Sequence, residues 1–356
     1  MTDRALTERV SPFRFRGTSA IAWLRSGPLV SMVLFLVASS VDAHHGFAPH
    51  YDPEQHVTIE GTISRLDFVN PHSFVYVEVE SDAGELDEYW CEMQSRSQLE
   101  RKGVTAASFA IGAQIRIDGF QARRDPLGCE FAAGILPDGT ELVLRNETGQ
   151  SQYFAEVIQS ESGVLGTWHR KTFPGAGINP SYREFFTDAA REAVTEFDVI
   201  ADNPILSCNP MSAIQSWAVP GLPIVVRWEG DDIIIQHEFM DIERVVHMSV
   251  DSHPTDVPRT ELGYSIGRFE GDDLFIESAQ FSEGYLHSGI VRSEGFRLNE
   301  RLSIDPENGD LVVTWTATDP LYYTDTLEGS RILVRTNLEI SPYDCVPEVG
   351  HGSTNK

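Results

Sequence analysis

The sequence predicts an all-β protein with a minor helical content, built as two β-barrels that follow one another along the chain. Three observations lead to this prediction. Apolar and polar residues alternate over many short segments, as they do in strands with one buried face. In the first half, three such segments are followed by a short helical segment and two more strands. In the second half, a Gly-Asp turn signal recurs before apolar segments.

The first half begins with a long alternating segment, residues 56–69. Its apolar residues change parity between Ile63 and Leu66, which predicts a bulge or a sharp bend in one long strand. Ser95 is placed to cap a short helix that Gly103 ends. This order of elements is that of an OB-like (oligonucleotide/oligosaccharide-binding) five-stranded barrel, which we predict over residues 44–145. The other four strands are expected at residues 73–81, 87–93, 114–122 and 129–136.

The second half opens with Gly166-Thr167-Trp168 and contains one helical segment, residues 187–197. Three acidic Gly turns then precede apolar strands. We interpret them as tight hairpin turns in which Gly supplies a positive φ, because they lack the further spaced oxygen ligands of a calcium loop. These turns are Glu229-Gly230-Asp231-Asp232, Glu270-Gly271-Asp272-Asp273 and Glu307-Asn308-Gly309-Asp310.

The pattern of the second half predicts an antiparallel lipocalin-like barrel or a strongly curved sheet over residues 165–346, with an internal cavity. Residues 146–164 are polar and mixed in composition, and we expect them to form a linker. Residues 347–356 are expected to form a flexible tail.

The N-terminal residues predict export. Five arginines precede an apolar core within Gly27–Ala43, and small residues stand at Val41-Asp42-Ala43, which is the layout of a secretory signal peptide cleaved after Ala43. Retention of residues 1–43 as an anchor is the alternative. No later stretch is long and apolar enough to cross a bilayer, so stable membrane insertion is not expected after cleavage. A periplasmic or secreted location follows.

The protein is strongly acidic. The whole chain has a formal net charge of −27, and residues 1–43 contain five arginines against three acidic residues, so the remainder carries −29. Such a surface repels nucleic acids and anionic membranes, and both are therefore poor candidate partners.

Four cysteines follow the predicted signal peptide, and their spacing matches no zinc ribbon. In an oxidising compartment, disulfides are favoured over free thiols. Four cysteines allow three pairings, of which one bridge in each barrel is the simplest. That arrangement pairs Cys91 with Cys129 and Cys208 with Cys345.

Several segments resemble a family of exported bacterial proteins known only as a domain of unknown function. In the first half these are AHHGF (43–47), VTIEGTI (57–63), VNPHSFVYVEV (69–79), LERKGVT (99–105) and LPDGTEL (136–142). In the second half, HEFMDIERVVH (237–247), GYSIGRFEGDDLFIESAQF (263–281) and RSEGFRLNERL (292–302) are similar to its usual β-rich companion region. Relatives tend to carry His where this chain has Arg292. The resemblance implies export and fold, and no established activity.

The first candidate site is a copper site at the predicted mature N-terminus. Cleavage after Ala43 gives His44 a free α-amine beside its imidazole, and a third nitrogen would complete a T-shaped site that suits copper(II). This arrangement is similar to the histidine brace of lytic polysaccharide monooxygenases. We choose His72 as the third ligand, with His45 and His50 as alternatives. The competing interpretation is a solvated terminus, with His72 hydrogen-bonded to a turn.

The second candidate site is an acid–base set in the second barrel. Glu238, Arg244 and His247 lie in one strand–turn–strand segment, where a buried carboxylate beside an arginine or histidine can transfer protons. In a strand, Glu238 faces away from His237, so only one of the two can point inward. The competing interpretation is that Glu238–Arg244 and Glu300–Arg301 are ion pairs at the end of the barrel.

The leading functional hypothesis is an exported binding protein. It would hold a small apolar or amphipathic molecule in the C-terminal cavity, and copper at the N-terminal face. One alternative is a periplasmic enzyme that uses Glu238 with Arg244 or His247 on a small molecule. Another is an envelope interaction module that uses the open face of the N-terminal barrel. No nucleophile elbow, phosphate-binding loop or zinc-protease helix is present in the sequence.

Overall fold

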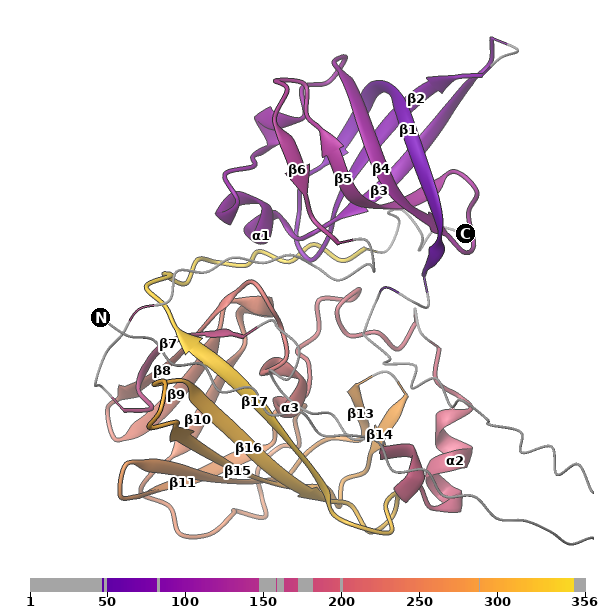
Figure 1. Ribbon diagram of the computed structural model, residues 1–356. Coiled ribbons are helices and arrows are strands. Elements are labelled where there is room, and N and C mark those ends of the chain that lie inside the picture. Colours follow the sequence, from indigo (N-terminus) through magenta and orange to yellow (C-terminus); the bar gives the residue numbers. More distant parts are fainter. Residues whose placement is uncertain are drawn as a thin grey trace, which may run out of the picture. The chain divides into compact units, whose positions relative to one another are not determined.

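We describe the protein from a computed structural model (Figure 1). The structure describes residue 47 and residues 50–81, 84–146, 158, 163–171, 182–198, 201–287 and 289–348, with His287 described by its backbone alone. The predicted signal peptide, His44, His45 and most of the predicted linker lie outside the described residues. Within the described ranges, no helix combines the length and the apolar character needed to cross a bilayer.

The first six strands curve around one core (Figure 1). They are hydrogen-bonded in the order β3-β2-β1-β4-β5-β6, and an additional parallel pairing of β3 with β5 closes the sheet on itself. This closure confirms the predicted OB-like barrel, to which the short strand β6 is an unpredicted addition on the edge of β5. The strands are β1 (Tyr51–Asp67), β2 (Ser73–Glu80), β3 (Leu86–Met93), β4 (Gln114–Ala122), β5 (Gly128–Ile135) and β6 (Glu141–Val143).

The predicted irregularity in the first strand is present. The register of β1 against β2 shifts between Ile63 and Arg65, so Ile63 points into the core and Leu66, three residues later, packs against the same core. Helix α1 (Arg96–Arg101) begins at the predicted cap, where Ser95 and Gln98 form a reciprocal capping box. A 3-10 turn, η1 (Ala106–Ser108), leads from α1 into β4.

The second half forms a closed nine-stranded barrel, which confirms the barrel alternative of the prediction. Its order is β10-β11-β12-β15-β16-β17-β7-β8-β9, and every neighbouring pair is antiparallel except β10 and β11. The strands are β7 (Gly166–Arg170), β8 (Pro223–Glu229), β9 (Asp232–His237), β10 (Glu243–His247), β11 (Tyr264–Glu270), β12 (Asp273–Ala279), β15 (Arg297–Ile304), β16 (Leu311–Thr318) and β17 (Leu327–Arg335).

Several short elements lie outside the barrel wall. The hairpin of β13 and β14 packs beside α2 (Figure 1), and both contribute to one hydrophobic cluster. Thr187 caps α2, so the predicted helix begins where expected and ends three residues earlier. These elements are η2 (Tyr182–Phe185), α2 (Asp188–Val194), α3 (Ala213–Ser216), η3 (Phe239–Asp241), β13 (Gly284–His287) and β14 (Ile290–Arg292).

Two of the three acidic Gly turns are the tight hairpins that were predicted. Gly230 and Gly271 have φ values of 61° and 64° and stand first in the two-residue turns that join β8 to β9 and β11 to β12. The third is different: β15 ends at Ile304 and β16 begins at Leu311, so Gly309 belongs to a longer loop.

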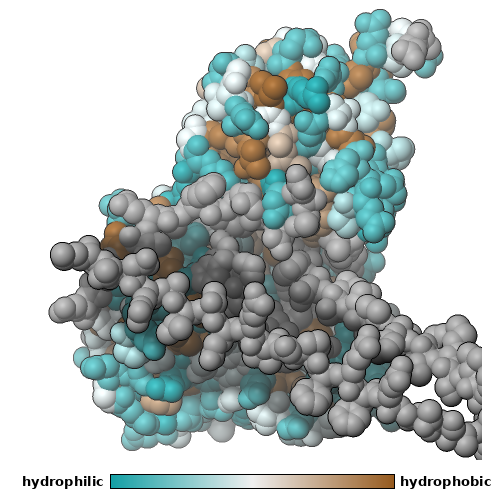
Figure 2. All heavy atoms as spheres, in the orientation of Figure 1, coloured by the Kyte–Doolittle hydropathy of each residue, from teal (hydrophilic) through white to brown (hydrophobic). Residues whose placement is uncertain are grey.

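Large side chains fill much of the second barrel. Trp168 and Trp217 are fully buried there, among aliphatic residues from strands on all sides of the wall. On the face of the molecule visible in Figure 2, hydrophilic residues make up much of the coloured surface, and hydrophobic residues occur in small groups. The alternation that predicted the strands therefore reflects an inward apolar face and an outward polar face.

Both predicted disulfides are present. Cys91 on β3 bonds to Cys129 on β5, where the two residues are paired in register. Cys208 bonds to Cys345 in the C-terminal segment that follows β17. None of the described cysteines is free.

Candidate functional site

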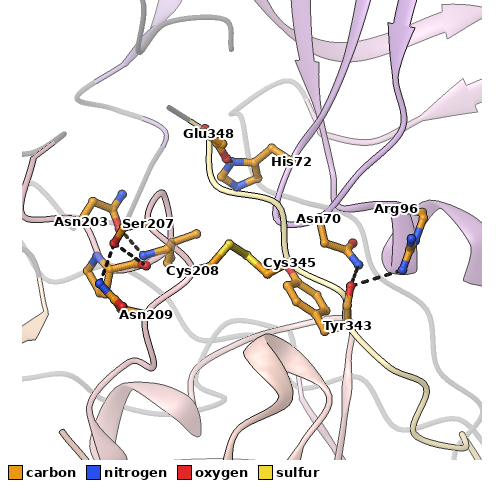
Figure 3. Close-up of a disulfide and its surroundings, with 12 residues drawn as sticks. Asn70, His72, Arg96, Asn203, Ser207, Cys208, Asn209, Tyr343, Cys345 and Glu348 are labelled. Carbon is orange, nitrogen blue, oxygen red and sulfur yellow. Dashed lines mark hydrogen bonds and ion pairs between the residues drawn. A yellow bond between two sulfur atoms is a disulfide. The ribbon is translucent and has the colours of Figure 1, made fainter. Parts of the chain in front are cut away.

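A histidine and three carboxylates gather on one face of the N-terminal barrel. His72 stands just before β2, and its Nδ1 atom lies 2.6 Å from Oε1 of Glu348 and 3.2 Å from Oε1 of Glu92. Figure 3 shows His72 beside Glu348. Glu130 lies next to Glu92 because the two residues are paired in register across β3 and β5. We call His72, Glu92, Glu130 and Glu348 the histidine–glutamate cluster.

The neighbours of the cluster balance part of its negative charge. The guanidinium of Arg145 donates from Nε to Glu130, and the hydroxyl of Tyr51 donates to Glu92. Glu130 and Glu348 are both 2% exposed, so their charges are held in a region with little water. Cationic or hydrogen-bonding partners are required for carboxylates in such a place.

Burial and mutual repulsion shift the pKa values in this cluster. Burial alone lowers the pKa of His72, but the charges of Glu92 and Glu348 outweigh it and raise the pKa to about 10. Burial raises the pKa of Glu130 to about 7, with Arg145 opposing the rise and Glu92 adding to it. Burial also raises the pKa of Glu92. His72 is therefore an imidazolium at neutral pH. The carboxylates that hold it have little contact with water.

The C-terminal segment brings Glu348 to His72. Cys345 bonds to Cys208, and Cys345 also forms a parallel bridge with Asn70, two residues before His72 (Figure 3). The amide of Val346 donates to the Asn70 carbonyl at 2.7 Å, and that of Glu348 donates to the Leu206 carbonyl at 2.9 Å. Glu348 was expected to lie in a flexible tail, and it is buried.

The sequence reasoning missed Glu92, Glu130 and Glu348, although a signal was present for two of them. Each of the first two directly follows a bridged cysteine, in Cys91-Glu92 and Cys129-Glu130. A disulfide between neighbouring strands places the residues after each cysteine beside one another on the opposite face of the sheet. The paired Cys-Glu steps therefore indicate a pair of adjacent carboxylates. Glu348 carries no comparable signal.

The predicted copper ligands are only partly described. His44 and His45 lie outside the described residues. Among the described residues, no group of three or more His, Cys, Asp or Glu side chains is placed to hold a metal ion. His50 is half-buried, and burial and the charge of Arg124 lower its pKa. His50 and His72 are the predicted copper ligands that the structure describes, and they do not belong to such a group.

Phe47 lies close to the histidine–glutamate cluster. Its ring centroid lies 5.8 Å from that of Tyr51, which donates to Glu92, and the Arg145 guanidinium lies 5.0 Å from the Phe47 ring.

The structure does not bring Glu238, Arg244 and His247 together. In the described part of the chain, no hydrogen bond or ion pair joins any two of them. Glu238 precedes η3 outside the strands, and His247 contacts Asp232 through Nδ1 at 3.0 Å. The ring of His247 also stacks on Tyr264, with centroids 4.5 Å apart. The predicted acid–base set is therefore dispersed over three locations.

Arg244 belongs to a hydrogen-bond network inside the second barrel. Its guanidinium donates to Glu300 through two nitrogens, to Ser265 at 2.9 Å and to Ser278 at 2.7 Å. The indole of Trp217 donates to the same Glu300 carboxylate at 2.8 Å. The proposed pairs Glu238–Arg244 and Glu300–Arg301 are therefore wrong. Arg244 pairs with Glu300 because both point inward, whereas Arg301 points outward and pairs with Asp273.

Glu238 is engaged by a different arginine. Arg101, at the end of α1, forms an ion pair with the Glu238 carboxylate, and the Ser341 amide donates to the same oxygen at 3.0 Å. Burial raises the pKa of Glu238, while the Ser341 amide and Arg101 act in the opposite direction. Its contacts are those of a residue that holds segments of chain together.

A second set of inward-facing polar groups lies beside Glu300 in the barrel, because Trp315 is paired in register with Glu300 across β15 and β16. Arg331 is 2% exposed, its Nη1 donates to the Ser330 carbonyl at 2.7 Å, and its Nε has no acceptor among the described residues. The indole Nε1 of buried Trp315 likewise has no acceptor there. The Tyr182 ring lies 5.9 Å from that of Trp315 in an edge-on arrangement. We call Tyr182, Trp315 and Arg331 the donor cluster.

Gly329 creates the space for this cluster. Trp315 is paired in register with Gly329, and a Cβ atom on Gly329 would lie 2.5 Å from the indole ring. The indole therefore rests directly against the backbone of β17, two residues from Arg331 on the same face. Any side chain at position 329 would displace the ring.

An open groove crosses the outside of β12, β15, β16 and β17. Outward-facing side chains contribute most of its lining, among them Phe275, Arg301 and Thr316. Arg301 lies over the Phe275 ring, with its guanidinium 5.8 Å from the centroid. The groove is separate from the inward-facing donor cluster, although Trp315 contributes atoms to both.

Residues 33–129 match a family described as a family of unknown function (DUF6152). The match covers the strands from β1 to β4 and the start of β5, so the N-terminal part of the chain is similar to a domain of that family. No curated protein sequence matches the chain. The similarity of the C-terminal region to a companion domain remains a prediction from the sequence.

Proposed function

We propose that the protein is an exported binding protein that holds a small amphipathic molecule in its C-terminal barrel. The binding site would lie at the donor cluster, where Arg331 and Trp315 carry buried hydrogen-bond donors beside apolar residues. The observation that carries this proposal is the absence of acceptors for Arg331 Nε and Trp315 Nε1 among the described residues.

Buried polar groups without partners are uncommon in folded proteins, and each costs about 1–3 kcal/mol when it is left unsatisfied. One bound molecule with acceptor atoms would satisfy both donors. The neighbouring side chains would surround the apolar part of that molecule, because Tyr182, Phe186, Leu298 and Leu327 belong to one buried cluster with Trp315.

Native mass spectrometry of the protein purified from the exporting cell tests this proposal. A retained small molecule should appear as an added mass that is lost on denaturation. Trp315→Phe keeps the aromatic bulk, removes the donor and should weaken retention. Trp228→Phe is a matched control, because Trp228 is exposed and lies outside the donor cluster. The proposal fails if refolded, ligand-stripped protein binds no amphipathic molecule.

The enzyme alternative receives less support. Arg244 uses four of its five N–H donors on Glu300 and two serines, and its side chain is 4% exposed, so it is poorly placed to bind a substrate. Glu238 is bound by Arg101 and the Ser341 amide. A proton-transfer group must reach its substrate within hydrogen-bond distance, and neither residue offers that geometry. Export itself rests on the signal-peptide pattern and on the two disulfides, which suit an oxidising compartment.

A copper site at His72 is a second candidate function. Metal-binding histidines commonly use one ring nitrogen for the metal while the other donates to a carboxylate. The contacts of Nδ1 with Glu92 and Glu348 fit the carboxylate side of this arrangement and leave Nε2 as the ligand atom. His44 would supply its amine and imidazole, and copper would displace the proton that His72 carries.

Electron paramagnetic resonance of the copper(II)-loaded protein tests this candidate. A chain that begins at His44 should bind one equivalent with nitrogen coupling, and His72→Ala should remove one nitrogen from the spectrum. A chain extended by one N-terminal alanine should lose most of the affinity. His56→Ala is the control, because His56 is exposed on β1. Equal weak binding by the His44 and alanine-extended chains would exclude the site.

A further inference from the structure

We infer that the molecule held in the C-terminal barrel is an organic anion, whose acidic group binds Arg331. This inference rests on the proposed binding function and adds the chemical class of the ligand. It is carried by the charge balance inside the barrel, by the kind of polar atoms that are left without partners, and by the apolar residues that surround them.

The charges inside the barrel do not balance. Arg244 is neutralised by Glu300, which approaches two of its guanidinium nitrogens. Arg331 has no carboxylate partner among the described residues. A second arginine, Arg170, lies near Arg331, and burial together with the charge of Arg170 lowers the pKa of Arg331 to about 10. A buried guanidinium stays protonated and is costly without a counter-charge.

This imbalance is unusual for the chain as a whole, which carries a net charge of −27. Acidic residues are plentiful on the surface and pair with outward-facing arginines of the barrel wall, for example Asp273 with Arg301 and Glu277 with Arg268. Buried Arg335 also has no carboxylate partner among the described residues, but it donates to two carbonyls, whereas Arg331 donates to one. The missing negative charge is what an anionic ligand would bring.

Both unsatisfied atoms of the donor cluster are hydrogen-bond donors. Arg331 Nε and Trp315 Nε1 both require an acceptor, and neither can accept a hydrogen bond. Carboxylate and phosphate oxygens match a guanidinium through two parallel hydrogen bonds, and such charge-assisted bonds are stronger than neutral ones. A cationic ligand would be repelled, and a neutral alcohol can accept hydrogen bonds but brings no negative charge to the guanidinium.

The surroundings supply the apolar half of the site. The ring of Tyr182 lies edge-on to that of Trp315, with centroids 5.9 Å apart, and the charge of Arg331 opposes the rise that burial causes in the pKa of Tyr182. Elements outside the barrel wall pack against this site, because α2 and β14 contribute Ala190, Ile290 and Val291 to the cluster that contains Trp315. An acidic head on an apolar body fits a region with this division of polar and apolar groups.

Isothermal titration calorimetry of the ligand-stripped full exported chain tests this inference with four dodecyl compounds that differ in their head groups. These are laurate, dodecyl phosphate, dodecanol and dodecyltrimethylammonium, each below its micelle concentration. We expect one of the two anions to bind at least tenfold more tightly than dodecanol, with no binding of the cation. The preferred anion distinguishes a carboxylate ligand from a phosphate ligand.

Arg331→Gln should lower the ratio of anion affinity to dodecanol affinity by tenfold or more. The affinity for dodecanol itself should stay nearly unchanged. Arg331→Lys should restore part of the preference, because lysine keeps the charge and loses the paired geometry. Arg301→Gln is the matched control, since Arg301 faces outward and its side chain is 51% exposed. If Arg331→Gln does not fold, the head-group series on the unaltered protein and the Arg331→Lys variant still test whether the ligand is an anion.

The outcomes separate the two claims. Equal binding of the preferred anion and dodecanol, or an unchanged preference in Arg331→Gln, would overturn the anionic ligand and leave the binding function intact. Failure of all four compounds to bind would overturn the proposed function together with this inference.

Discussion

Arg101 and Glu238 form an ion pair that joins the end of helix α1 to the chain between β9 and β10. The Ser341 amide donates to the same carboxylate oxygen, so three segments that are distant in sequence meet at Glu238. The Glu238 side chain is fully buried, and that of Arg101 is 19% exposed. This carboxylate was predicted to be catalytic, and its contacts indicate a structural role.

Glu238→Ala should therefore destabilise the protein by about 3–5 kcal/mol, because removal of one partner leaves a buried charge unpaired. Urea unfolding measures this loss. Asp273→Ala is the control: its partner Arg301 is half exposed, and the expected cost is under about 1 kcal/mol. Equal costs for the two variants would contradict the structural role of Glu238.

The Arg244–Glu300 pair should behave as a strongly coupled unit. Arg244→Met or Glu300→Leu alone should each cost about 3–5 kcal/mol, because the remaining charge stays buried. The double variant replaces the ion pair with apolar groups and should cost much less than the sum of the two. A double-mutant cycle by chemical denaturation measures the coupling, and additive losses would show that the pair is not coupled.

His237 should make the protein less stable in mild acid. Burial, with the charge of Arg244, lowers its pKa to about 3 from an ordinary value of 6.5. Between these values the unfolded chain binds a proton that the folded protein does not, so the contribution of His237 is full above pH 6.5 and declines as the pH falls. His237→Gln should therefore lose less stability than the parent between pH 6.5 and 4.5, by about 2 kcal/mol.

Urea unfolding at each pH checks this difference. His56→Gln is the control, because His56 is exposed. A His237→Gln profile parallel to that of the parent would mean that His237 is protonated in the folded protein.

The Cys208–Cys345 bridge should contribute more to stability than Cys91–Cys129. It closes a sequence separation of 137 residues, compared with 38 for the other bridge. The loop-entropy relation gives about 5 kcal/mol for the longer loop and about 4 kcal/mol for the shorter one. Double serine variants of each pair, compared by thermal and urea unfolding, measure the order.

The Cys208→Ser/Cys345→Ser variant should also loosen the contact between Glu348 and His72, because Cys345 anchors the segment that carries Glu348. The pKa of His72 should then fall, which proton NMR of the imidazole can follow. The Cys91→Ser/Cys129→Ser variant is the matched comparison. An unchanged His72 titration in the first variant would show that Asn70 and Leu206 hold the segment without the bridge.

Local patterns in the sequence predicted most of the fold. The parity change after Ile63, the cap at Ser95 and the positive-φ positions at Gly230 and Gly271 all involve residues that interact within a few positions of one another. Closure of the two barrels depends on pairings such as β3 with β5 and β7 with β17, which have no local signature. The order of elements predicted the first closure, and the parallel contact of β10 with β11 was not foreseen.

The candidate sites were predicted less completely for the same reason. His72 was predicted as a copper ligand from its local sequence, whereas its partner Glu348 comes from the other end of the chain. Arg244 was expected beside Glu238, its neighbour in sequence, and pairs instead with Glu300 on a distant strand. Arg331 was not considered, because nothing in its local sequence distinguishes an inward from an outward arginine.

The neighbouring positions of β7 and β17 in the barrel set the order in which this protein can assemble. A chain that emerges from its amino end offers β7 one free edge until the last strand has been delivered, and Cys208 likewise waits for Cys345. Incompletely translocated chains therefore expose an unpaired strand edge, through which they can aggregate. Biogenesis of the second barrel should accordingly depend on a holding chaperone until almost the whole polypeptide is present.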